Sequence, residues 1–83
     1  MVHIPHELQA EFSDDKSLVE RLTRTNYPFR RLAARYEEIN SNINRIESED
    51  QPTSDEVLER LKKQRLKLKD DIATMIAQMK RRM

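Results

Sequence analysis

The stretch that decides the fold is YPFRRLAARYEEINSNINRIESE, residues 27–49, followed after a short turn by SDEVLERLKKQRLKLKDDIATMIAQMKR, residues 54–81. In both segments apolar residues recur at alternating steps of three and four. This spacing averages 3.5 residues and places one narrow apolar seam on each helix, as coiled-coil packing requires. The seam positions are Phe29, Leu32, Tyr36, Ile39, Ile43 and Ile46, then Leu58, Leu61, Arg65, Leu68, Ile72, Met75 and Met79. The sequence therefore predicts an all-α fold built on an antiparallel, coiled-coil-like helical hairpin.

Local signals at the helix ends agree with this hairpin. Thr53 and Glu56 form a capping-box pattern at the start of the second long helix. Lys80 and Arg81 place cations at its negative end. Residues 40–44 of the first long helix have low helix propensity. We therefore expect that stretch to be helical because it packs against a partner.

The residues before the hairpin predict a shorter helical segment. Residues 1–12 are expected to form a flexible N-terminal segment with a short helical turn, and 13–24 a short helix with Ser13 as its N-cap. Asn26 precedes Tyr27-Pro28 and marks a second cap, because proline is tolerated in the first turn of a helix. A break there is favoured over one kinked helix. Residues 1–83 thus form a single domain.

Composition limits what the chain can bury alone. Of 83 residues, 36% are apolar and 37% charged, which is too few apolar residues to surround a globular core. The absence of cysteine excludes disulfides and thiolate metal sites. Two helices in contact along one seam leave part of that seam exposed. We therefore expect completion by oligomerisation, with a second copy or with a helix of another protein as partner.

The sequence indicates neither an enzyme nor a membrane protein. The absence of glycine excludes glycine-rich phosphate loops, and a helical hairpin offers no deep pocket, so we expect no cofactor and no small-molecule substrate. His3, His6 and Glu7 have helical spacing but lack a rigid frame, so surface histidines are favoured over a metal site. Apolar runs are far shorter than the ~20 residues of a membrane span, and no signal-peptide pattern is present. We expect a cytoplasmic protein.

The basic stretch KKQRLKLK, residues 62–69, is the best candidate for contact with an anionic partner. Residues 55–83 hold nine Lys/Arg against five Asp/Glu, although the net charge of the chain is only +1. The cations wrap around the helix, Asp70 and Asp71 follow at once, and no exposed aromatic residue accompanies them. A solvated helix face is therefore favoured, ahead of contact with an acidic protein and then with nucleic acid.

Two residues of this stretch have a special position. Arg65 occupies the seam, where it either extends its guanidinium to water or pairs with a carboxylate such as Glu37 or Glu38 and fixes the register. These two interpretations carry equal weight. Leu66 falls outside the seam; an ordinary exposed leucine is favoured over a second contact surface used in oligomerisation.

The block Leu61 to Ile72, LKKQRLKLKDDI, is similar to the YdcH-like family of small bacterial proteins. The likeness continues at Phe12, at residues 18–22, and at Pro28-Phe29. The resemblance implies a bacterial, cytoplasmic helical hairpin whose function is unknown, so no catalytic or binding residues carry over. The positions of interest in the block are Lys62, Lys63, Arg65, Lys69 and Asp70.

These features suggest three functional hypotheses. The leading one is a protein-interaction module that acts through self-association or helix–helix contact. The alternative is a nucleic-acid-associated factor that uses the basic C-terminal helix, whose binding would fall steeply with salt. A peripheral membrane helix is the weakest, because the hairpin already uses the apolar face of that helix.

Overall fold

The computed structural model describes residues 6–48 and 55–82, and within these ranges it contains helices and no strand. The elements in chain order are α1 (His6–Glu11), the 3-10 helix η1 (Ser13–Asp15), α2 (Lys16–Thr25), α3 (Tyr27–Ser48) and α4 (Asp55–Arg81). The predicted all-α hairpin is confirmed. The capping box at Thr53 lies outside the described residues.

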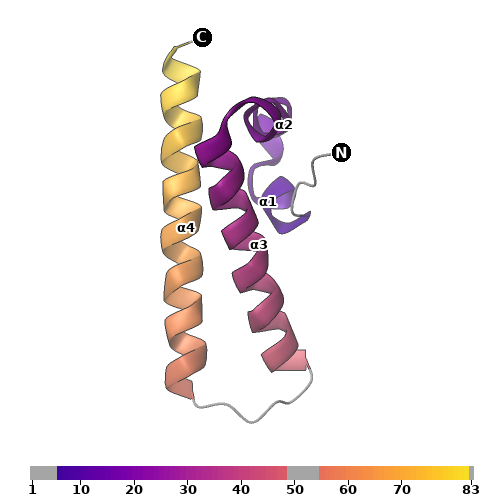
Figure 1. The fold of residues 1–83 in the computed structure, drawn as a ribbon, viewed down its shortest axis with the longest axis vertical. Helices are drawn as coiled ribbons and strands as arrows, with labels where there is room; N and C mark the ends of the chain where they lie inside the picture. The colour runs from indigo at the N-terminus through magenta and orange to yellow at the C-terminus, as the bar shows by residue number, and fades with distance from the viewer. Residues whose placement is uncertain (1–5, 49–54, 83) are drawn as a thin grey trace.

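The two long helices run antiparallel and give the molecule an elongated shape of 46 × 24 × 22 Å (Figure 1). The N-terminal elements α1 and α2 lie beside the half of α3 that is nearest its start, and α4 extends beyond that start. We call this part the docked end: α1, η1, α2, residues 27–39 and residues 65–81. The tip consists of residues 40–48 and 55–64, where the described chain is two helices thick.

A break at Asn26 separates α2 from α3, as the sequence favoured. Asn26 has an extended backbone, with φ −121° and ψ 106°. Its Oδ1 accepts a hydrogen bond of 2.9 Å from the backbone N–H of Phe29, which satisfies one free donor of the new helix. Pro28 costs nothing in this first turn, because its missing N–H would have no partner inside the helix.

The predicted N-cap at Ser13 is wrong. Ser13 lies inside η1, which is closed by a hydrogen bond of 3.0 Å from the N–H of Asp15 to the carbonyl of Phe12. The α-helix starts later, at Lys16, with Asp15 in the cap position but without a capping hydrogen bond from its side chain. The Asp15 carboxylate instead forms an ion pair of 3.0 Å with Lys80 of α4. A tertiary contact has replaced the local one.

The core is concentrated in the docked end. Leu8, Leu22 and Phe29 are at most 1% exposed there. Burial extends to the start of the tip, where Ile43 is fully buried. Residues 40–44, which have low helix propensity, are therefore helical while packed against a partner, as predicted. The remaining core residues are Leu18, Val19, Ala33, Tyr36, Ile39, Leu68, Ile72 and Ile76.

Candidate functional site

Arg65 reaches across the hairpin from α4 to α3. Its Nη1 donates a hydrogen bond of 2.9 Å to Oδ1 of Asn40, a residue that is 4% exposed. The sequence left two interpretations open, a guanidinium extended to water or one paired with a carboxylate such as Glu37 or Glu38, and the observed acceptor is instead a neutral amide. At 100° per residue, Asn40 lies closer to the seam of α3 than either glutamate does. The charged seam residue therefore has a partner on the facing helix, of a different chemical type from the one expected.

The other half of the Asn40 amide has no partner. Its Nδ2 is buried and has no hydrogen-bond acceptor among the described residues. A buried donor that lacks a partner costs about 1–3 kcal/mol. The pair Asn40–Arg65 thus forms a polar layer in an apolar seam, and such layers reduce stability while they select one register.

Four of the six residues singled out in the sequence lie together. A shallow hollow of about 140 Å³ is lined by Lys62, Arg65, Leu66 and Lys69 of α4 and by Tyr36 of α3. Leu66 is 55% exposed, so it presents an apolar surface between cations.

The other two residues lie elsewhere. Lys63 lines a separate hollow with Glu56, Glu59 and Arg60. Asp70 is exposed, and its backbone carbonyl accepts a hydrogen bond of 3.0 Å from Thr74.

The lysines of the basic stretch are paired with carboxylates. Two of the pairs hold separate elements together: Lys62–Glu47 at 3.1 Å and Lys69–Glu11 at 3.3 Å. Two others are within α4: Lys63–Glu59 and Lys67–Asp71, both at 3.7 Å. A nucleic-acid phosphate would have to compete with these carboxylates. The arrangement therefore does not favour the basic stretch as a nucleic-acid site.

A third hollow lies on a different side of the hairpin. It measures about 190 Å³ and is lined by Arg35, Ile39, Gln64, Lys67, Leu68 and Asp71, which we call the open face. The N-terminal segment, by which we now mean α1, η1 and α2, forms ion pairs with Lys69 and Lys80 of α4. Helical geometry places those two lysines roughly 140° to 180° around α4 from Gln64 and Asp71. The open face is therefore turned away from the N-terminal segment.

Apolar residues continue the open face in both directions along the hairpin. The contacts Asn40–Arg65 and Glu47–Lys62 set the antiparallel register of α3 and α4. That register places three apolar pairs on this side, each seven residues from the next. They are Leu32 with Met75, Ile39 with Leu68, and Ile46 with Leu61. The middle pair is buried and the outer two are half-buried.

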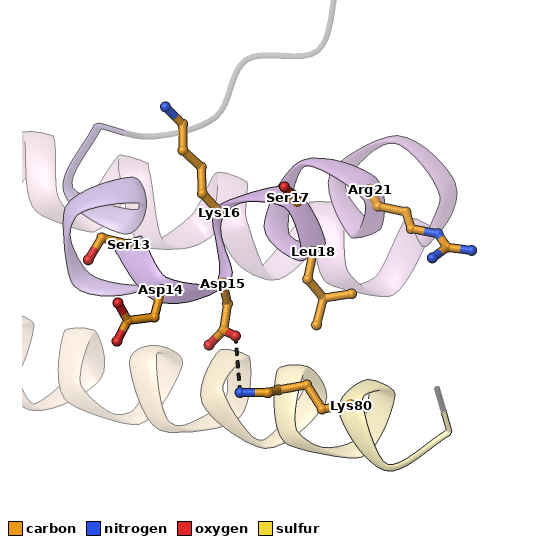
Figure 2. Close-up of a pocket in the computed structure, with 8 residues that line it drawn as sticks. All are labelled: Ser13, Asp14, Asp15, Lys16, Ser17, Leu18, Arg21 and Lys80. Atoms are coloured by element: carbon orange, nitrogen blue, oxygen red, sulfur yellow. Dashed lines mark ion pairs between the residues drawn. The ribbon is translucent and has the colours of Figure 1, made fainter.

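Another hollow, of about 380 Å³, lies where η1 meets α2 (Figure 2). Figure 2 shows Asp15 and Lys80 directed toward one another, whereas Lys16 and Arg21 extend away from that pair. Side chains that diverge in this way do not converge on a reacting atom. Its identifiable role is structural, because the ion pair joins the N-terminal segment to α4.

Metal-binding and membrane-spanning features are not found in the described part of the chain. Among the described side chains of residues 8–48 and 55–82, no group of three Asp, Glu or His residues could hold a metal ion. The side chains of His3, His6 and Glu7 lie outside this described part, so the expectation of surface histidines there stays untested. In the same ranges, no helix combines the length and the apolar character needed to cross a bilayer.

Comparison with protein families gives one match. Residues 29–76 match DUF465, a family described as a protein of unknown function. The chain belongs to the DUF465 family. Because YdcH is a DUF465 protein, the YdcH-like resemblance seen in the sequence is confirmed. The matched DUF465 segment spans both helices of the hairpin, with the polar layer and the open face. Neither curated proteins nor solved structures give a match.

Proposed function

We propose that this DUF465 protein is a protein-interaction module that associates with a second copy of itself through the open face. The observation that supports this proposal is the row of three apolar pairs on one side of the hairpin, of which the outer two are half-buried. A second hairpin laid on this side would bury them and complete a four-helix bundle. The three apolar pairs lie seven residues apart along each helix, so the contact between the two copies would extend over about 21 Å.

The surface of the single chain is large enough for such an interface. The chain exposes 6098 Å², whereas a compact monomer of this mass exposes roughly 5200 Å². An interface of standard size takes ~800 Å² from each partner, which is a small part of the surface that the chain exposes. An elongated hairpin therefore has the surface that a dimer needs.

Charge also favours a second copy over a strongly charged partner. The chain has a net charge of +1, so two copies do not repel one another strongly. The open face itself carries both signs, with Arg35 and Lys67 beside Asp71. A two-fold axis through the middle pair, Ile39 with Leu68, would bring each outer apolar pair onto the other outer pair of the partner copy.

A matched pair of charge reversals tests this proposal. Asp71→Lys gives the open face three cations per copy, so the two copies repel one another. Asp70→Lys makes the same chemical change one residue earlier, about 100° around α4 and outside the open face. We expect Asp71→Lys to raise the dissociation constant of the dimer at least tenfold, since like charges across an interface cost several kcal/mol. Asp70→Lys should behave as the wild type.

Sedimentation velocity over a range of concentrations measures the result, and circular dichroism verifies that all variants are equally helical. A dimer that Asp71→Lys dissociates and Asp70→Lys leaves intact supports the proposal. A fully helical wild-type monomer at high micromolar concentration would overturn it and leave a helix of another protein as the partner. Equal weakening by both variants would also contradict it, because the interface would then lie elsewhere.

A further inference from the structure

The strongest uncompensated positive charge of the described chain lies at the corner between α2 and α3, not on the basic stretch of α4. Residues 21–36 contain five arginines and no Asp or Glu. Because α2 ends at Thr25 and α3 begins at Tyr27, the chain turns in the middle of this stretch. We call Arg21, Arg24, Tyr27, Arg30 and Arg31 the arginine corner.

Tyr27 is the exposed aromatic residue of this corner. Tyr27 is 60% exposed, whereas Tyr36, the other tyrosine, is 5% exposed and part of the core. The guanidinium groups of Arg30 and Arg31 lie 5.5 and 5.9 Å from the centre of the Tyr27 ring. Both contacts are within the distance of cation–π interactions. The ring and two guanidinium groups are therefore held together at the surface without being used for core packing.

The cations of the corner also differ from those of α4 in their pairing. Of the ion pairs between described residues, none involves Arg21, Arg24, Arg30 or Arg31. Figure 2 shows Arg21 extending away from the nearby Asp15–Lys80 pair. An anion that approaches the corner would therefore meet guanidinium groups without first displacing a carboxylate of the described chain.

We propose that the arginine corner binds single-stranded nucleic acid, with phosphates on the arginines and a base on the Tyr27 ring. A guanidinium presents a planar fork of donors that matches a phosphate, and it is more weakly hydrated than an ammonium. Exposed aromatic rings provide the stacking surface that proteins use for unpaired bases. A flexible single strand can follow the turn of the chain between α2 and α3.

The corner does not suit a membrane surface equally well. Peripheral membrane helices insert a continuous apolar face among the lipids. The apolar residues of this corner are instead committed to the core, with Leu22 and Phe29 at most 1% exposed. The binding site uses other residues than the open face, so it is independent of the proposed self-association.

Fluorescence anisotropy with a labelled oligothymidine of about 20 nucleotides tests the proposal, with salt as the variable. Four arginine–phosphate contacts predict that the logarithm of the affinity falls with the logarithm of salt concentration with a slope of about −3. Arg30→Ala with Arg31→Ala should halve that slope. Tyr27→Ala should weaken binding roughly tenfold, the loss of one stacked base. Tyr27→Phe keeps the ring and should retain the affinity.

Lys62→Ala with Lys63→Ala is the matched control, because it removes two cations from the basic stretch of α4. It should change neither affinity nor slope. Equal losses in the lysine and arginine double variants would contradict the proposal, because the charge of the whole chain would then be responsible. Absence of binding at low salt would also overturn it. So would co-sedimentation with phosphatidylserine vesicles without binding of the oligonucleotide, since the corner would then recognise lipid. Sedimentation velocity on the same samples reports self-association separately.

Discussion

The docked end and the tip carry the same heptad pattern, yet they bury it to different extents. At the docked end, Ile72 and Ile76 of α4 are at most 3% exposed, although Met75, on the side of the open face, is half-buried. At the tip, Leu58 and Leu61 of the same helix are half-buried, and Val57 is 39% exposed. The difference is the third layer, because α1 and α2 lie only against the docked end among the described residues. A coiled-coil seam between two helices therefore supplies half of a core, and a third element or a second copy supplies the rest.

Matched truncations at the two ends should show the largest difference. Phe29→Ala removes a ring that is fully buried at the docked end, which costs about 3–5 kcal/mol. Leu58→Ala at the half-buried tip should cost about 1 kcal/mol. Urea denaturation followed by circular dichroism measures both changes in the free energy of unfolding. Equal costs would mean that the tip is as fully packed as the docked end, as happens if a second copy covers it.

The boundary between the two ends contains the polar layer, and its removal should have an intermediate effect. Arg65→Leu leaves the buried amide of Asn40 without either hydrogen-bond partner, which costs about 1–3 kcal/mol. Adding Asn40→Leu removes that penalty, so the double variant should be more stable than Arg65→Leu by a similar amount. A double-mutant cycle by urea denaturation measures the coupling. Additive changes would show that the hydrogen bond contributes nothing to the hairpin.

The role in register that the sequence offered as one of two interpretations of Arg65 stays a prediction. If the polar layer selects one pairing of the helices, the double leucine variant should be more stable but broader in mass distribution by sedimentation velocity. A single sharp species of unchanged mass would remove the support for that role.

The heptad spacing was sufficient to predict α3 and α4, because an apolar seam and helix-end residues are local features of the sequence. Asn26 was predictable for the same reason, since a cap acts on a residue three positions away. Asp15 was not, because its carboxylate forms a tertiary ion pair with Lys80 in place of the cap. The burial of Leu8 was not predictable either. It is the one large apolar residue of a short polar helix, so it belongs to no repeating pattern, yet it is fully buried.

The candidate sites show the same limit. The Arg65 position was predictable from the seam, but its partner Asn40 was not, because a polar residue does not contribute to an apolar pattern. The basic stretch of α4 was visible as a run of lysines, whereas the carboxylates that pair with Lys62 and Lys69 come from other helices. The arginine corner had a local signal, the acid-free stretch 21–36 around Tyr27. Charge counts over longer segments did not show it, because they average these arginines with acidic residues on either side.

The smallest effect should come from the ion pairs that join the N-terminal segment to α4. Lys80→Met keeps the apolar stem and removes the charge that pairs with Asp15. Lys80 is 56% exposed, so solvent screens the pair and the free energy of unfolding should fall by less than about 1 kcal/mol. Lys63→Met is the matched control, because it breaks an exposed pair within α4 alone.

Hydrogen exchange shows whether this ion pair or apolar burial holds the N-terminal segment against the hairpin. If burial holds the N-terminal segment in place, amide protection in α2 should hardly change in Lys80→Met, because Leu22 and Val19 stay packed against the hairpin. Selective loss of protection in α2, absent in Lys63→Met, would mean instead that charge holds the docked end together. High salt should then reproduce that loss in the wild-type chain, since salt screens exposed charges but strengthens apolar burial or leaves it unchanged. Retained protection in high salt would establish that the third layer is held by apolar contact.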